Sequence, residues 1–91
     1  MQDIYGVAAF RSRQQVLMFE GALRRNGVET RIVSTPRDVS MGCGLSVRFR
    51  LEDTDRVVRT LRQVNTSNLI GLYRVEYTGG GKPRLTAISM R

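Results

Sequence analysis

The chain has 91 residues, of which 41% are hydrophobic, and 15 basic against 8 acidic residues give it a net charge of +7. A chain of this length sustains one modest core, so we expect one domain. No apolar run approaches the length of a membrane span, and the first residues lack the pattern of a signal peptide. With one cysteine and no histidine, an intramolecular disulfide and a typical structural zinc site are excluded, and a reducing cytoplasm is the expected location.

The first third of the chain predicts a strand, a helix and a second strand. Residues 4–10 are a run of small and apolar residues that is typical of a buried strand. Ser12 is a good N-cap, and Gly27 is a typical helix stop. Between them, four apolar residues recur at helical spacing: Val16, Phe19, Ala22 and Leu23. Residues 29–34 alternate as a second strand.

The middle of the chain predicts a third strand, a second helix and a fourth strand. In residues 45–50 the apolar residues Leu45, Val47 and Phe49 alternate with Ser46, Arg48 and Arg50. Acidic residues then precede arginines over residues 52–62, which suits the dipole of a helix. The inward stripe of this helix is Val57, Val58, Leu61 and Val64. Residues 69–77 predict the fourth strand.

The order βαββαβ predicts an α+β fold, the ferredoxin-like sandwich, with a four-stranded antiparallel sheet and two helices on one face. Right-handed crossovers give the strand order 4-1-3-2. We expect residues 1–77 to form this domain and residues 78–91 to form a Gly-rich linker and a C-terminal tail.

The only cysteine, Cys43, lies between Gly42 and Gly44 in the loop that precedes the third strand. The predicted topology brings this loop to the N-terminus of the Ser12 helix, with Arg11, Arg13 and Arg37 nearby. A helix N-terminus and arginines lower the pKa of a thiol, which favours Cys43 as a nucleophile. Two other interpretations stay open: a buried hydrophobic cysteine, and a phosphate-binding nest formed by the glycine pair with Arg37.

The third strand also allows an RNA-binding interpretation, because Arg48 and Arg50 lie on the exposed face of the predicted sheet. Stacking aromatic residues are expected on such a face, and Phe49 points to the opposite one. Tyr73 and Tyr77 are predicted to pack, as is Met18. Nucleic acid is therefore not an expected partner.

Several residues together resemble the small bacterial family described as "putative selenium/sulfur carrier-like proteins". They are Ser12, Glu20, the turn Thr35-Pro36-Arg37, Ser40, the pair Cys43-Gly44 and the pair Arg48-Phe49. The similarity covers about residues 4–75. The resemblance implies a cytoplasmic protein in which Cys43 holds sulfur or selenium as a persulfide or perselenide.

The leading hypothesis is therefore a non-enzymatic carrier with Cys43 as the acceptor and Ser12, Arg37, Ser40, Gly42 and Gly44 as binding residues. Its partners would be a donor such as a cysteine desulfurase and an unknown acceptor, with no membrane and no cofactor; an oligomer stays open. The alternative is a small anion- or metabolite-binding regulatory module with an incidental cysteine. A thiol enzyme is disfavoured because no histidine base and no resolving cysteine exist.

Overall fold

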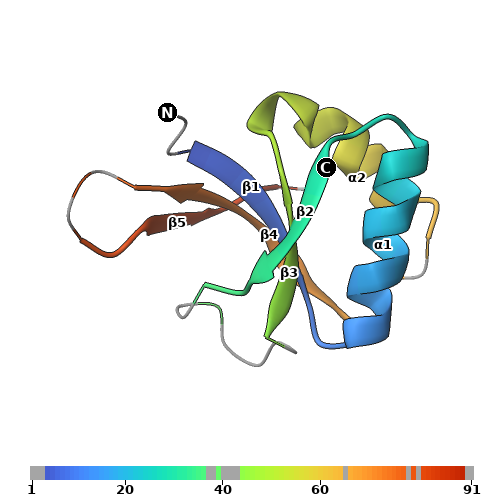
Figure 1. Cartoon of the computed structure of the whole chain (residues 1–91), viewed down its shortest axis with the longest axis horizontal. Helices are drawn as coiled ribbons and strands as arrows, with labels where there is room; N and C mark the ends of the chain where they lie inside the picture. The colour runs from blue at the N-terminus through green and yellow to red at the C-terminus, as the bar shows by residue number, and fades with distance from the viewer. Residues whose placement is uncertain are drawn as a thin grey trace.

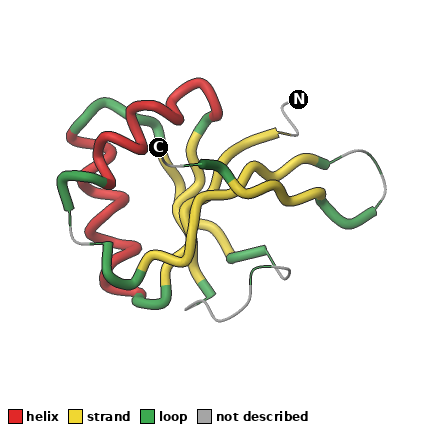
Figure 2. The backbone as a smooth tube through the Cα atoms, turned by 180° about the vertical axis from the view of Figure 1, so that it is seen from behind, coloured by secondary structure: helices red, strands yellow, loops and turns green. Residues whose placement is uncertain are grey.

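The computed structural model describes residues 4–36, 39, 44–64, 66–77, 79 and 81–89. The elements, in chain order, are β1 (Ile4–Phe10), α1 (Arg13–Arg25), β2 (Thr30–Ser34), β3 (Leu45–Phe49), a 3-10 turn (Leu51–Asp53), α2 (Thr54–Leu61), β4 (Leu69–Glu76) and β5 (Arg84–Ala87). The strands form one antiparallel sheet in the order β2-β3-β1-β4-β5. Both helices lie on the same side of this sheet (Figures 1 and 2).

The predicted α+β class and antiparallel sheet are confirmed, but the predicted number of four strands is wrong. Strands β1 to β4 have the expected order, and β5 adds a fifth strand beyond β4. Residues 84–87 pair with residues 73–76 of β4, so the backbone groups on that edge of β4 find partners within the chain. The segment was expected to be a tail because four residues after a Gly-rich run carry too little periodicity to predict a strand.

Helix α1 begins and ends where its sequence signals lie. The Ser12 side chain accepts a hydrogen bond from the Gln15 amide at 3.3 Å, and Gly27 follows the last turn with a φ of +81°. The buried residues of the helix are those of the predicted stripe: Val16, Phe19, Ala22 and Leu23. The packing prediction for Met18 is wrong, because this side chain is 60% exposed on the outer side of the helix.

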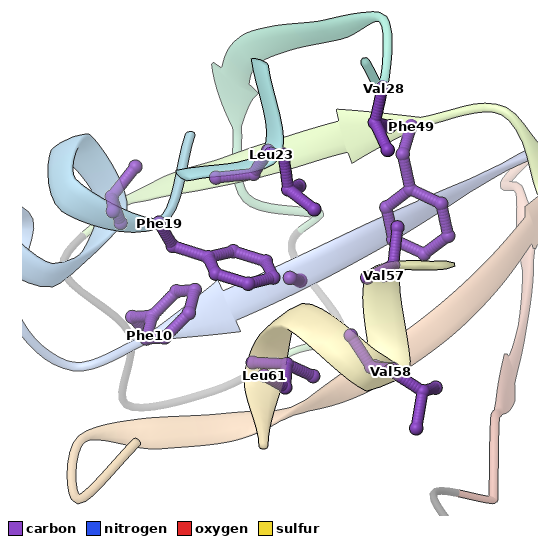
Figure 3. Packing of buried hydrophobic residues seen from close by; sticks show 12 residues of the cluster. Phe10, Phe19, Leu23, Val28, Phe49, Val57, Val58 and Leu61 are labelled. Carbon is purple, nitrogen blue, oxygen red and sulfur yellow. The ribbon is translucent and has the colours of Figure 1, made fainter. Parts of the chain in front are cut away.

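The core lies between the helices and one face of the sheet (Figure 3). It combines residues of both helices with Ala8, Phe10, Val47, Phe49 and Leu72 of the three central strands. Phe10 and Phe19 pack with ring centroids 5.5 Å apart. The Phe49 ring lies directly over Gly6, its cross-strand partner, where a Cβ atom would overlap the ring atoms Cε2 and Cζ. Glycine at position 6 is therefore a packing requirement.

Polar contacts fix the helices relative to each other and to β2. The side chain of Asn26, after α1, donates a hydrogen bond of 2.9 Å to the Thr60 hydroxyl of α2, which donates in turn to the Arg56 carbonyl. Glu20 of α1 accepts from the Thr30 hydroxyl of β2 at 2.8 Å and binds Arg24 at the same distance. Glu20, one of the residues behind the family resemblance, thus ties the first helix to the edge of the sheet.

The side of the sheet without helices is called the open face here. The alternation of the strands places on it Tyr5, Val7 and Ala9 of β1, Arg31 and Val33 of β2, Ser46 and Arg48 of β3, Gly71, Tyr73 and Val75 of β4, and Tyr77 just beyond β4. Val7, Ala9, Ser46 and Val75 are fully buried despite this position. Ser46, predicted on the polar side of its strand, is among them, and its buried hydroxyl is satisfied by a hydrogen bond of 2.8 Å shared with the Thr35 hydroxyl.

Candidate functional site

Two of the six predicted site residues, Ser12 and Gly44, belong to the described part of the chain. The predictions for Cys43, Arg37, Ser40 and Gly42 lie outside the described residues. The structure does describe a residue next to two of them, because Gly44 is bonded to Cys43 and Pro36 is bonded to Arg37.

Gly44 forms one flank of the cysteine segment, and its geometry explains why a glycine stands there. Its φ is +91°, a conformation that L side chains rarely adopt, and a Cβ atom at this position would meet no atom within 4 Å. Its carbonyl accepts a hydrogen bond of 3.0 Å from the Thr35 amide. This bond joins the ends of β2 and β3, so the segment between Thr35 and Gly44 starts and finishes at one point of the sheet.

The register of the sheet places this point beside the N-terminus of α1. Ala9 of β1 pairs with Ser46 of β3 in an antiparallel ladder. Gly44, two residues before Ser46, is therefore level with Arg11, two residues after Ala9. Ser12 follows Arg11 and caps the helix. Gly44 and Ser12 therefore lie at one end of the sheet, whereas the expected place of Cys43 and Arg37 at this end lies outside the described residues.

The described charged residues beside the Ser12 cap are arginines. The first turn of α1 contains no acidic residue, so no carboxylate there offsets the positive end of the helix dipole. Arg11 and Arg13 flank the Ser12 cap, both side chains are exposed, and neither forms an ion pair with a carboxylate of the described residues. The combination stabilises an anion that approaches this end of the sheet.

A second candidate site, which the sequence reasoning missed, lies at the opposite end of the sheet. A cavity of about 510 Å³ is lined by ten residues: Ile4, Tyr5, Glu29, Thr30, Arg31, Arg48, Phe49, Arg50, Leu51 and Glu52. Arg50 binds both acidic residues of the lining, Glu29 at 3.1 Å and Glu52. Its pKa is raised by Glu52 and, to a smaller extent, by Glu29. Glu52 thus pairs with Arg50 two residues earlier in the chain.

Aromatic rings adjoin this cavity. The Arg48 guanidinium lies over the Tyr5 ring, 4.0 Å from the centroid, and Tyr5 stacks on Tyr77 with centroids 6.4 Å apart. Burial, followed by the hydrogen bond with Tyr77, raises the pKa of Tyr5. The packing prediction for Tyr77 is wrong in that its side chain is 44% exposed. Tyr73 and Tyr77 lie two residues to either side of Val75, which the register with β1 places on the open face, so both tyrosines belong to that face.

The described residues offer no ligand set for a metal centre. No group of three or more His, Cys, Asp or Glu residues capable of holding a metal ion occurs among residues 4–36, 39, 44–64, 66–77, 79 and 81–89. Over the same residues, neither helix has the length and apolar character needed to cross a membrane.

The described residues form a small α+β domain in which Gly44, directly before β3, lies at the same end of the sheet as the N-terminus of α1. A family model described as "Putative Se/S carrier protein-like" matches residues 5–70, and the chain belongs to that family. The family predicted from the sequence is thereby confirmed. No curated protein and no solved structure matches the chain.

Proposed function

We propose that this protein is a sulfur or selenium carrier in which Cys43 is the acceptor. The observation that carries the proposal is the family match, which spans the cysteine segment together with both elements that flank it. The geometry of Gly44 supports it: the backbone turns there without a side chain, and open space surrounds that position. A partner protein therefore has access to the residue next to Cys43.

The proposed transfer conserves electrons and needs no external oxidant or reductant. The Cys43 thiolate attacks the outer sulfur of a persulfide on the donor, the donor's sulfur–sulfur bond breaks, and the donor leaves as a thiolate with the electron pair. Cys43 then carries a persulfide, which an acceptor nucleophile attacks in the same way to release the Cys43 thiolate. A perselenide donor delivers selenium by the same steps.

The thiolate form of Cys43 is stabilised in this proposal by the positive end of α1. Arg11 and Arg13, with Arg37 as a further predicted contributor, add positive charge beside the Ser12 cap. Ser12 and Ser40 are proposed as hydroxyl donors to the anion, and Gly42 and Gly44 keep bulk away from it. We further propose the ferredoxin-like description for β1 to β4 with the two helices, and a cytoplasmic location, where thiols stay reduced.

The first experiment measures the transfer of labelled sulfur or selenium to the protein. The purified protein is incubated with a cysteine desulfurase and radiolabelled cysteine or selenocysteine, and the adduct is located by mass spectrometry of the intact chain and of its peptides. One sulfur or selenium atom on Cys43 is expected, and Cys43→Ser is expected to take up no label because an alcohol cannot form a persulfide. Labelling of the serine variant at the wild-type level would refute the carrier function.

The second experiment tests the electrostatics of the site. Alkylation of Cys43 should stay fast at mildly acidic pH, where a free cysteine is almost wholly protonated. The double variant Arg11→Gln/Arg13→Gln should slow the reaction at that pH and leave the rate of the fully ionised thiolate unchanged. The matched control is Arg25→Gln/Arg59→Gln, which removes two exposed arginines elsewhere on the helices. Equal slowing by both double variants would show that net charge, and not this edge, governs the thiol.

A further inference from the structure

Two arginines face each other across neighbouring strands, and neither has a carboxylate partner among the described residues. Arg31 of β2 and Arg48 of β3 are direct cross-strand partners on the open face. Like charges directly opposite each other destabilise a sheet. Neither side chain forms an ion pair with a carboxylate of the described residues, whereas Arg50 nearby binds both Glu29 and Glu52. Arg31 and Arg48 therefore form a preformed position for an external anion, and both line the cavity of about 510 Å³.

Flat surfaces for stacking lie beside this anion position. The Arg48 guanidinium covers the Tyr5 ring, and Tyr77 extends the stack with nearly half of its side chain exposed. Tyr73 lies on the same face, with its ring against Gly71. Tyrosine rings and guanidinium planes are the groups on which unstacked bases pack in protein complexes with single strands.

We propose that the open face, around Tyr5, Arg31, Arg48 and Tyr77, binds single-stranded nucleic acid. Phosphates bind between Arg31 and Arg48, and bases stack on the aromatic row. The expectation against a nucleic-acid partner rested on the lack of aromatic residues on this face, and the structure places three tyrosines there. The proposal is independent of Cys43, which belongs to none of these strands.

The arrangement favours a polymer over a single nucleotide. The basic and aromatic residues are spread over β2, β3, β1 and β4, and three strand spacings of about 4.8 Å give a span of about 14 Å. One nucleotide does not cover that span. The net charge of +7 also suits a polyanion, whose binding releases counterions. No helix of the described residues covers this side of the sheet (Figure 2), and on it Arg31 and Tyr77 are exposed while Tyr5 and Arg48 are half-buried.

The test measures binding of fluorescently labelled oligo-U and oligo-dT to the full chain by anisotropy over a range of salt concentrations. The variant Arg31→Gln/Arg48→Gln should weaken binding at least about tenfold and reduce the log–log salt slope by about 1.4, since each phosphate contact on a single strand contributes about 0.7. Tyr77→Leu should weaken binding about 5- to 150-fold at unchanged salt slope, because one stacking surface is lost. Circular dichroism checks that each variant is folded.

The control variant is Arg25→Gln/Arg59→Gln, which has the same net charge as Arg31→Gln/Arg48→Gln but leaves the open face intact. We expect it to weaken oligomer binding at most about threefold. Equal losses for the two double variants would overturn the proposal, as would tighter binding of duplex than of single strands. Binding of UMP with the same dependence on Arg31 and Arg48, without binding of the oligomers, would assign the cavity to a free nucleotide and also overturn it. Cys43→Ser should bind the oligomers like the wild type, so this result and the outcome of the label-transfer experiment are separable.

Discussion

Replacement of Gly6 by alanine tests the close packing of β1 against the Phe49 ring. The added methyl group would overlap two ring atoms, and Phe49 is only 1% exposed, so the ring has no free space into which to move. Overpacking of this kind costs about 1–3 kcal/mol. Exchanging glycine for alanine normally gains about 0.5–1 kcal/mol within a strand or helix, because the unfolded chain loses freedom. The difference is a loss of up to about 2.5 kcal/mol, and because the methyl group overlaps two buried ring atoms we expect about 1–2 kcal/mol.

The assay is urea denaturation followed by circular dichroism, with thermal melting as a second measurement. For a domain of this size, the expected loss lowers Tm by roughly 5–15 °C. Gly21→Ala is the matched control: it lies in α1, the nearest atom to its new Cβ is an Arg25 nitrogen at 3.5 Å, and it should stabilise the protein by about 0.5–1 kcal/mol. The cost of Gly6→Ala should shrink when Phe49 is replaced by leucine. If Gly6→Ala is as stable as Gly21→Ala, the packing argument is wrong.

Two further predictions concern the cap of α1 and the tyrosine stack. Ser12→Ala removes the acceptor of the Gln15 amide and should cost about 1 kcal/mol in denaturant unfolding, whereas Ser12→Asp should retain most of the stability; equal losses would contradict capping. The pKa of Tyr5 is raised, first by burial. The neutral Tyr5 side chain therefore contributes to stability below the unfolded pKa of about 10, and this contribution is lost as the pH rises through the pKa of the folded protein. Titration of tyrosinate absorbance should show a late component that disappears in Tyr5→Phe, and an unchanged titration curve would count against this assignment.

Local periodicity was sufficient to predict the elements that build the core. Residues 4–10 form the predicted first strand, and the apolar stripe of the first helix is its buried face. Val57, Val58 and Leu61 are buried in α2 as expected. The position of Gly44 relative to Ser12 followed from the order of the elements, because an antiparallel ladder between β1 and β3 leaves little freedom in where the strand ends meet.

The features that could not be predicted depend on pairing between distant strands. β4 shifts register where Ala9 and Phe10 of β1 pair with Gly71 and Leu69, so alternation along the sequence does not by itself assign its faces. The Arg31–Arg48 pair exists only because β2 and β3 adopt one particular register. The cavity beside it, likewise, is formed by residues from three separate segments of the chain.

The fifth strand determines what happens to the sheet when the chain is truncated before residue 84. The family match ends at residue 70, near the start of β4, whereas β5 follows the Gly-rich run and Ile88 donates its amide to the Leu72 carbonyl. A chain cut within the Gly-rich run keeps both helices but lacks β5. The backbone groups of β4 that pair with β5 then have no partners along the projecting β4–β5 hairpin seen in Figure 1. An uncovered edge of this kind recruits strands from other molecules. The last strand thus replaces the eight-residue edge of β4 with its own four-residue edge, which offers fewer backbone groups for pairing with another molecule.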